Sequence, residues 1–401
     1  MVQADAPPPR PVIEAPAGLR FDFNEGARIS LPSRSAGLWR VRLSDAGTGN
    51  TLYDTTLSGG MVMSAKKWFF RCRVEVFDGE KPVLDHTYDA RGRDVLVRFH
   101  IGTLGDVIAW FPAAAVFAAQ HGCRLTCCMS PLIIPLFRDA YPHIRFVTPA
   151  EADDRPYYAT YKMMMFFGDR ERLWNTCEGR TLSLQDNASY LLGMPPQERR
   201  PILSLPDESR PIADPYVCIA TQATGQAKYW NNPDGWDQTV SFLKGLGLRV
   251  ICIDQKPVTA VGHIRNAIPR AAEDETGDRP LVERARSLRH ATLFVGLSSG
   301  LSWLAWAAGA PVVMISGFTH PTNEFATPYR VINWHACNSC WNDDTAPFDA
   351  ADRTDFLWCP RHKDTPRMFE CSRLITAHQV ISTIKRVPAI AALLPARPVM
   401  A

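Results

Sequence analysis

The 401-residue sequence has little that would place the protein in a membrane or on a nucleic acid. It has no apolar run long enough to span a bilayer, and its proline- and alanine-rich first ten residues lack the apolar stretch of a signal peptide. The formal net charge of +3 is too small to indicate nucleic-acid binding by itself. We therefore expect a cytoplasmic protein with no membrane span and no nucleic-acid partner.

Disulfides are also not expected, because the eleven cysteines of a cytoplasmic chain should be thiols or metal ligands. Four of them are grouped: two residues separate Cys337 from Cys340, and Cys359 and Cys371 follow after eighteen and eleven more. This spacing predicts a structural metal finger, for which zinc and iron are equally suitable. The alternative is a set of scattered buried thiols, although the other seven cysteines lack such spacing.

The chain contains one strand–loop–helix–strand unit between residues 291 and 325. A short apolar run ends at Gly296, two serines and Gly300 follow, and an apolar helix begins there. Gly309 and Pro311 end that helix, and residues 312–315 restart a strand. A small-residue loop at a helix N-terminus offers free N–H groups to a phosphate, although many such loops bind nothing.

The rest of the chain fits an α/β protein with an added β domain. Residues 38–77 contain alternating apolar segments, which predict antiparallel strands in a small β-barrel or sandwich. Strands that alternate with helices on both sides of a proline-rich linker predict two Rossmann-like domains. The expected order is a flexible lead (1–18), a β-barrel domain (19–93), the first Rossmann-like domain (94–208), the second (209–335), the metal finger (336–373) and a C-terminal helix (374–401).

Asp106 has two interpretations. It follows two glycines at the end of a predicted strand, where its carboxylate can cap the next helix. Open α/β folds place their chemistry at the same edge of the sheet, so Asp106 could instead serve as a general base. The local sequence alone does not separate these roles.

Two further polar residues follow strands of the second Rossmann-like domain. Lys228 lies in a glycine-containing loop after the strand that begins at residue 216; such a lysine is often only solvated. Asp254 ends the next strand, where a carboxylate commonly binds a ribose hydroxyl. Residues 270–279 could serve that purpose instead.

These motifs together resemble the autotransporter heptosyltransferases, which belong to the ADP-heptose:lipopolysaccharide heptosyltransferase superfamily. The resemblance covers about residues 94–385 and rests on Gly102–Pro112, on Lys228 before a tryptophan, on residues 296–325 and on the cysteine cluster. It implies a GT-B glycosyltransferase that transfers heptose from ADP-heptose, with inversion, to serine hydroxyls of an autotransporter adhesin passenger domain. It also implies one structural iron per chain and a large homo-oligomer, a dodecamer.

The resemblance implies roles for individual residues. Asp106 would deprotonate the acceptor serine, and Lys228 would offset charge on the departing ADP. No divalent metal is expected at the donor, because no Asp-x-Asp sequence lies at a suitable turn. The iron ligands would be the four cysteines above, and the donor site would include Thr103, Thr224, Gly225, Gln226, Asp254, Ser298, Ser299, Gly300, Thr319, His320 and Asn323.

The sequence leaves two alternative functions open. A lipopolysaccharide heptosyltransferase would usually carry Asp-Thr-Gly-Leu-x-His where this chain has Ser298–Trp303, so the missing Asp and His weigh against it. A non-enzymatic zinc-finger nucleic-acid binder or scaffold would need a basic, aromatic face near the cysteines. Residues 337–371 instead contain few bases and many acids, among them Asp343, Asp344, Asp349, Asp352 and Asp355.

Overall fold

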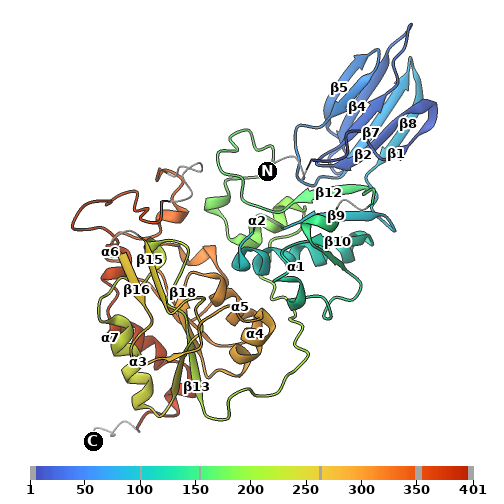
Figure 1. Ribbon diagram of the computed structural model, residues 1–401. Helices are drawn as coiled ribbons and strands as arrows, with labels where there is room; N and C mark the ends of the chain where they lie inside the picture. The colour runs from blue at the N-terminus through green and yellow to red at the C-terminus, as the bar shows by residue number, and fades with distance from the viewer. Residues whose placement is uncertain (1–5, 100–101, 153–154, 262–263, 348–354, 396–401) are drawn as a thin grey trace, which may run out of the picture.

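The computed structural model describes residues 6–99, 102–152, 155–261, 264–347 and 355–395. The molecule is elongated, with an antiparallel β sheet at one end, an α/β domain in the middle and a second α/β domain at the other end (Figure 1). Within the described ranges, no helix is both long enough and apolar enough to cross a bilayer.

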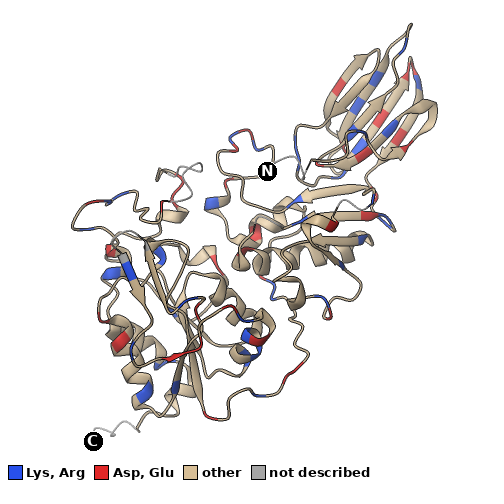
Figure 2. Ribbon diagram, viewed as in Figure 1, with Lys and Arg blue, Asp and Glu red and all other residues tan. Residues whose placement is uncertain are grey.

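The N-terminal part of the chain consists of antiparallel strands, as the alternating sequence predicted. Four of them form a separate sheet in the order β5-β4-β7-β8. Basic and acidic residues alternate across this sheet (Figure 2), where Arg40 pairs with Asp54 and Arg73 with Asp85, each at 2.7 Å. The strands are β1 (Ile13–Glu14), β2 (Arg20–Asn24), β3 (Arg28–Leu31), β4 (Trp39–Asp45), β5 (Thr51–Leu57), β6 (Gly60–Met63), β7 (Cys72–Asp78) and β8 (Lys81–Thr87).

The other N-terminal strands do not close a barrel with this sheet. Instead β2 pairs in parallel with β12 (Ala159–Lys162) of the first α/β domain, and β3 and β6 continue that sheet outward. Side chains fix the junction: Asn24 Nδ2 donates to Tyr157 O at 2.9 Å, and Lys162 Nζ lies 2.7 Å from Glu25 Oε1. The described ladders therefore form two sheets and do not close the barrel that was one of the two expected forms, and the pairing of β2 with β12 joins residues on both sides of the expected boundary at residue 93.

The expected flexible lead is partly ordered. Residues 1–5 lie outside the described part, but β1 pairs with β2. The buried ion pair between Arg28 and Asp22 explains this order, because both side chains also form hydrogen bonds with the backbone of the lead. Arg28 NH1 donates to Pro8 O at 2.6 Å, and Asp22 Oδ2 accepts from Val12 N at 3.1 Å.

The first α/β domain continues with a parallel sheet in the order β11-β10-β9-β12. Its long helix α1 (Leu104–His121) ends at Gly122, whose φ of 60° is the left-handed conformation that glycine adopts most easily. The expected strand, helix and terminator are thus confirmed. The other elements are β9 (Asp94–Arg98), β10 (Arg124–Cys128), β11 (Arg145–Val147) and α2 (Leu184–Leu191).

The second α/β domain contains a parallel sheet in the order β17-β14-β13-β18-β19-β20. Its apolar helix α5 (Gly300–Ala308) lies between β18 (Phe294–Leu297) and β19 (Val312–Ile315), as residues 291–315 predicted. The remaining elements are β13 (Tyr216–Ile219), α3 (Gly235–Gly245), β14 (Arg249–Cys252), the hairpin β15 (Val258–Val261) and β16 (Ile264–Ala267), β17 (Glu273–Asp274), α4 (Leu281–His290) and β20 (Arg330–Val331).

The end of the chain folds onto the second α/β domain. In place of the single C-terminal helix expected over 374–401, there are α7 (Ala377–Ile384) and α8 (Pro388–Ala391), and residues 396–401 lie outside the described part. A short helix, α6 (Glu370–Arg373), precedes them. Pro388 cannot continue a preceding helix and therefore starts a new one. Val380, Ile384 and Ile390 are buried against α3 and the sheet.

Candidate functional site

A cavity of about 860 Å³ lies between the two α/β domains. It is bounded by the start of α1, the loop after β13, the loop between β18 and α5, and residues of the predicted metal finger (336–373), called the cysteine finger below. Nine predicted site residues line it: Thr103, Asp106, Thr224, Gly225, Lys228, Asp254, Ser298, Ser299 and Gly300. Four others do not, and their contacts are given below: Gln226, Thr319, His320 and Asn323.

The N-termini of α1 and α5 meet at this cavity. A β-carbon on Gly105 would lie 2.9 Å from the Trp303 ring, and one on Gly300 would lie 3.1 Å from the Gly105 nitrogen. Only glycines therefore allow the two helices to approach this closely. Because each helix N-terminus carries partial positive charge, both favour an anionic ligand in the cavity.

Asp106 occupies the third position of α1. Its Oδ2 accepts hydrogen bonds from the backbone N and the Oγ1 of Thr103, both at 2.9 Å. Its Oδ1 accepts no hydrogen bond from the described residues, and the side chain is only half-buried. The cap and the base are thus compatible roles, since one oxygen fixes the helix end while the carboxylate borders the cavity.

Lys228 lies across the cavity from the start of α1, at the end of the 3₁₀ helix Gln226–Lys228. Burial lowers the pKa of its ammonium group, and the carboxylates of Asp106 and Glu324 oppose that shift. Its Nζ lies 5.5 Å from the centroid of the Phe318 ring. The structure therefore brings the two predicted catalytic residues, far apart in sequence, within electrostatic reach of each other.

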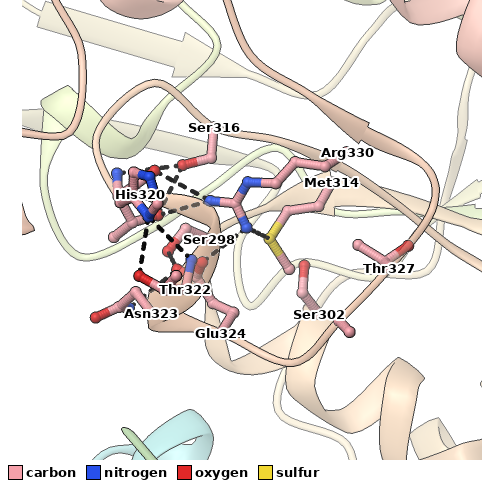
Figure 3. A network of polar contacts seen from close by, with 12 residues as sticks. Ser298, Ser302, Met314, Ser316, His320, Thr322, Asn323, Glu324, Thr327 and Arg330 are labelled. Atoms are coloured by element: carbon pink, nitrogen blue, oxygen red, sulfur yellow. Dashed lines mark hydrogen bonds and ion pairs between the residues drawn. The ribbon is translucent and has the colours of Figure 1, made fainter. Parts of the chain in front are cut away.

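Glu324 was not identified from the sequence as a site residue, although the loop that contains it was. Its side chain is 2% exposed, accepts a hydrogen bond from Ser298 Oγ, and pairs with Arg330 NH1 at 2.8 Å (Figure 3). Asn323 Nδ2 donates to the same carboxylate at 3.1 Å. Asn323 therefore supports the serine loop from behind rather than facing the cavity.

Thr319 and His320 also stabilise this loop. Thr319 Oγ1 accepts from Arg330 NH2 at 3.1 Å and is bonded to Ser316 Oγ at 2.9 Å. The His320 ring bonds to Thr322, and its backbone N donates to Asn342 Oδ1 at 2.9 Å. Thr319 and His320 therefore lie behind the residues that line the cavity, and their assignment to the donor site stays a prediction.

Asp254 borders the cavity, but its carboxylate is already bonded to the protein. Oδ2 accepts from Thr221 N at 2.7 Å and from Thr221 Oγ1 at 2.9 Å, and Oδ1 accepts from Gln222 N at 3.2 Å. Burial raises the pKa of this carboxyl group, and the hydrogen bonds from Thr221 oppose the rise. These contacts favour a role in shaping the loop after β13.

The serine loop retains one unsatisfied group. Ser299 precedes the first residue of α5, and its Oγ is buried without a hydrogen-bond partner among the described residues. A buried hydroxyl of this kind needs a partner to offset the loss of water. A phosphate oxygen at the N-terminus of α5 would provide one.

The four predicted metal ligands lie near enough to one another to shift the pKa values of Cys340 and Cys371. Burial, followed by the neighbouring thiols of Cys337 and Cys359, raises the pKa of Cys340 to about 12. Burial raises the pKa of Cys371 to about 12 as well, with contributions from the other three cysteines. Bound metal would lower these pKa values and stabilise thiolates that burial otherwise disfavours, so the donor set fits a soft metal.

Two residues near the cysteines were not found from the sequence. The potential ligand atoms of Cys337, His362 and Glu370 all lie within 4.8 Å of one another. Glu370 is already engaged, because it accepts from Arg367 and from the Cys337 backbone N at 3.0 Å. It therefore suits the support of a ligand better than direct coordination. No spacing rule marks such a carboxylate in advance.

Comparison with known proteins places this geometry in a family. Residues 15–80 match the N-terminal domain of glycosyltransferase TibC, and residues 185–346 match glycosyltransferase family 9 (heptosyltransferase). The chain is 49% identical over 388 residues to the autotransporter heptosyltransferase BAHTCr of Citrobacter rodentium, covering 96% of this chain and 92% of that protein. It is 44% identical over 385 residues to BimC of Burkholderia thailandensis, an inactive autotransporter heptosyltransferase, covering 96% and 89% respectively.

A solved structure agrees with these relatives. The dodecameric iron-containing heptosyltransferase TibC, crystallised with ADP-D-β-D-heptose, superposes with a TM-score of 0.91 at 47% identity. The match covers 97% of this chain and 100% of that chain. The shared sequence and fold extend over nearly the whole molecule, and the chain belongs to the autotransporter heptosyltransferases.

Proposed function

We propose that this protein transfers heptose from ADP-heptose to serine hydroxyls of an autotransporter passenger domain. The observation that carries the proposal is the meeting of Asp106, Lys228 and two helix N-termini at one interdomain cavity. A negatively charged diphosphate is favoured beside Lys228 and the start of α5, and an acceptor hydroxyl is favoured beside Asp106.

The reaction follows from this arrangement as one displacement. The serine oxygen forms a bond to the anomeric carbon as the bond from that carbon to the diphosphate oxygen breaks. Asp106 takes the serine proton, and ADP leaves with the electron pair. Because attack and departure occur on opposite faces of the sugar, the anomeric configuration inverts. Lys228 offsets the charge that develops on ADP.

Ser298, Ser299 and Gly300 would hold the diphosphate through the loop and the helix N-terminus. The supporting contacts are the Ser298–Glu324 hydrogen bond, which fixes the loop, and the unpaired Ser299 Oγ. The same cavity is bordered, away from the serine loop, by Thr103, Thr224 and Gly225, which would also contact the donor.

The acceptor class is tested by competition. The purified protein is given ADP-heptose and either an autotransporter passenger domain or a lipopolysaccharide core acceptor, and released ADP is measured. We expect turnover with the passenger domain and none above background with the lipopolysaccharide. Turnover with lipopolysaccharide alone would assign the protein to the other acceptor class, and no turnover with either would place it with the inactive relative.

We also propose that Cys337, Cys340, Cys359 and Cys371 hold one structural iron per chain. Support comes from their mutual influence on pKa and from the iron-containing relative. The four thiolates would complete a tetrahedral site, so the metal would stabilise the fold without entering the reaction. Metal analysis of the purified protein by plasma mass spectrometry tests this, and zinc in place of iron would revise the metal.

A large homo-oligomer, and a dodecamer in particular, is proposed from the dodecameric relative alone. Light scattering coupled to size-exclusion chromatography tests it. A mass near twelve times 44.8 kDa is expected, whereas a monomeric mass would contradict the proposal.

A further inference from the structure

Arg180 of the first α/β domain is inserted into the cysteine finger. Its side chain is buried, and its guanidinium donates to four backbone carbonyls of one short segment. Nε reaches Trp341 O at 2.8 Å, and NH1 reaches Ala346 O at 3.0 Å. NH2 reaches both Cys340 O at 2.9 Å and Asp343 O at 2.6 Å. One arginine thus fixes the shape of residues 340–346.

Asn342 completes this contact from the finger. Its Nδ2 donates to the Arg180 carbonyl at 2.7 Å, and its Oδ1 accepts from His320 N, in the loop after β19, at 2.9 Å. The segment 340–346 therefore lies between the two α/β domains and is bonded to both.

The same segment begins at a proposed metal ligand. The carbonyl of Cys340 is bound by Arg180, while its thiol interacts with the thiols of Cys337 and Cys359. On the second domain, Gly317 packs so closely on the backbone of Cys371 that an added β-carbon would lie 2.3 Å from its carbonyl oxygen. Metal coordination and docking onto both domains consequently act on the same few residues.

The segment also forms part of the cavity wall. The Trp341 ring lines the cavity, stacks on Phe318 with centroids 5.8 Å apart, and meets Phe167 of the first domain edge-on at 5.7 Å. Phe356, further along the finger, accepts at its carbonyl a hydrogen bond from Gln226 N at 2.8 Å and also lines the cavity. A shift of the finger would therefore change the substrate site.

We propose that Arg180 is a latch that fastens the finger to the first α/β domain and couples metal retention to the shape of the cavity. The proposal rests on the cysteine metal site proposed above. A planar guanidinium can serve several carbonyls at once, whereas an ammonium group cannot match that fork. Since coupling is reciprocal, a metal that favours docking of the finger must be held more tightly when the finger is docked.

The test is the rate at which metal leaves the intact protein for an excess of chelator. The Arg180→Lys variant keeps the positive charge but loses most of the four bonds. We expect metal loss about tenfold faster than in the wild type, within the range usual for coupled sites. The matched control is Arg199→Lys, in the same domain, whose guanidinium donates, among the described residues, only to Pro195 O and Gln197 O of its own loop. It should lose metal at the wild-type rate.

Equal rates in the wild type and in Arg180→Lys would overturn the latch. If Arg180→Lys does not fold, Asn342→Ala is tested in its place. This substitution removes the hydrogen bonds from the Asn342 side chain to both domains and must also accelerate metal loss. A wild-type rate of metal loss in Asn342→Ala would overturn the latch as well. A second readout is glycosyl transfer. We expect kcat/KM to fall in Arg180→Lys while ADP binding stays within a few-fold, since the latch shapes the wall at Trp341. A wild-type protein that contains no metal would refute the metal site together with the latch.

Discussion

Asp106→Asn separates the two roles of this residue. The asparagine keeps the size of the side chain and offers a carbonyl oxygen where Oδ2 now accepts from Thr103 N and Oγ1, each at 2.9 Å. It removes the negative charge and the capacity to accept a proton. The substitution therefore changes the chemistry at the cavity while it keeps most of the helix cap.

The expected magnitudes differ for the two roles. Loss of a carboxylate at a helix N-terminus costs about 0.3–1 kcal/mol of folding stability, because the charge no longer interacts with the helix dipole. Loss of a general base slows the reaction by roughly 10²–10⁴-fold. At about 1.4 kcal/mol per tenfold, that is about 3–5 kcal/mol of activation free energy, several times the effect on stability.

The assay measures initial rates of ADP release with ADP-heptose and a passenger domain, alongside thermal unfolding. Asp237→Asn is the matched control, because Asp237 is likewise the third residue of a helix, α3, and does not line the cavity. We expect both variants to unfold slightly earlier than the wild type and only Asp106→Asn to lose its rate. Wild-type turnover in a folded Asp106→Asn would leave the helix cap as its only role.

Three further outcomes follow from the structure. Lys228→Met should lower kcat/KM by roughly 10²–10³-fold, the usual cost of one preorganised electrostatic group. Burial lowers the pKa of Lys228, so the folded state holds the lysine proton less tightly than the unfolded chain does. The variant should therefore keep or raise thermal stability below about pH 10. Unchanged turnover would remove Lys228 from the site. Cys359→Ser should lose the metal of each chain and lower the unfolding temperature, and retained metal would refute the ligand set. Gly317→Ala should destabilise the protein by about 1–3 kcal/mol, whereas Gly245→Ala, with open space around it, should be neutral or stabilising; equal unfolding temperatures would contradict the close packing on Cys371.

Local patterns in the sequence predicted the elements that form the site. The alternation of apolar runs and small residues was sufficient for β18, α5 and β19, and Gly122 and Gly309 end their helices in the left-handed conformation. The position of Asp106 at the start of α1 followed from the same reasoning. These features depend on interactions within a few residues, which a single sequence records directly.

Other features depend on contacts between distant parts of the chain and were missed. The pairing of β2 with β12 joins strands more than a hundred residues apart, and no periodicity in the sequence predicts this pairing. Arg180 belongs to no motif in the sequence, because its partners lie about 160 positions away. Glu324 was visible only as part of a polar loop, because its role depends on burial against Ser298 and Arg330.

The activity proposed for this protein is the transfer of heptose to serine hydroxyls. The most direct measurement is the intact mass of a purified passenger domain after incubation with ADP-heptose and this protein, followed by peptide mapping. We predict mass increases in whole heptose units, located on serines, with one ADP released for each heptose added. An unchanged passenger mass in the presence of folded, metal-loaded protein would contradict the account.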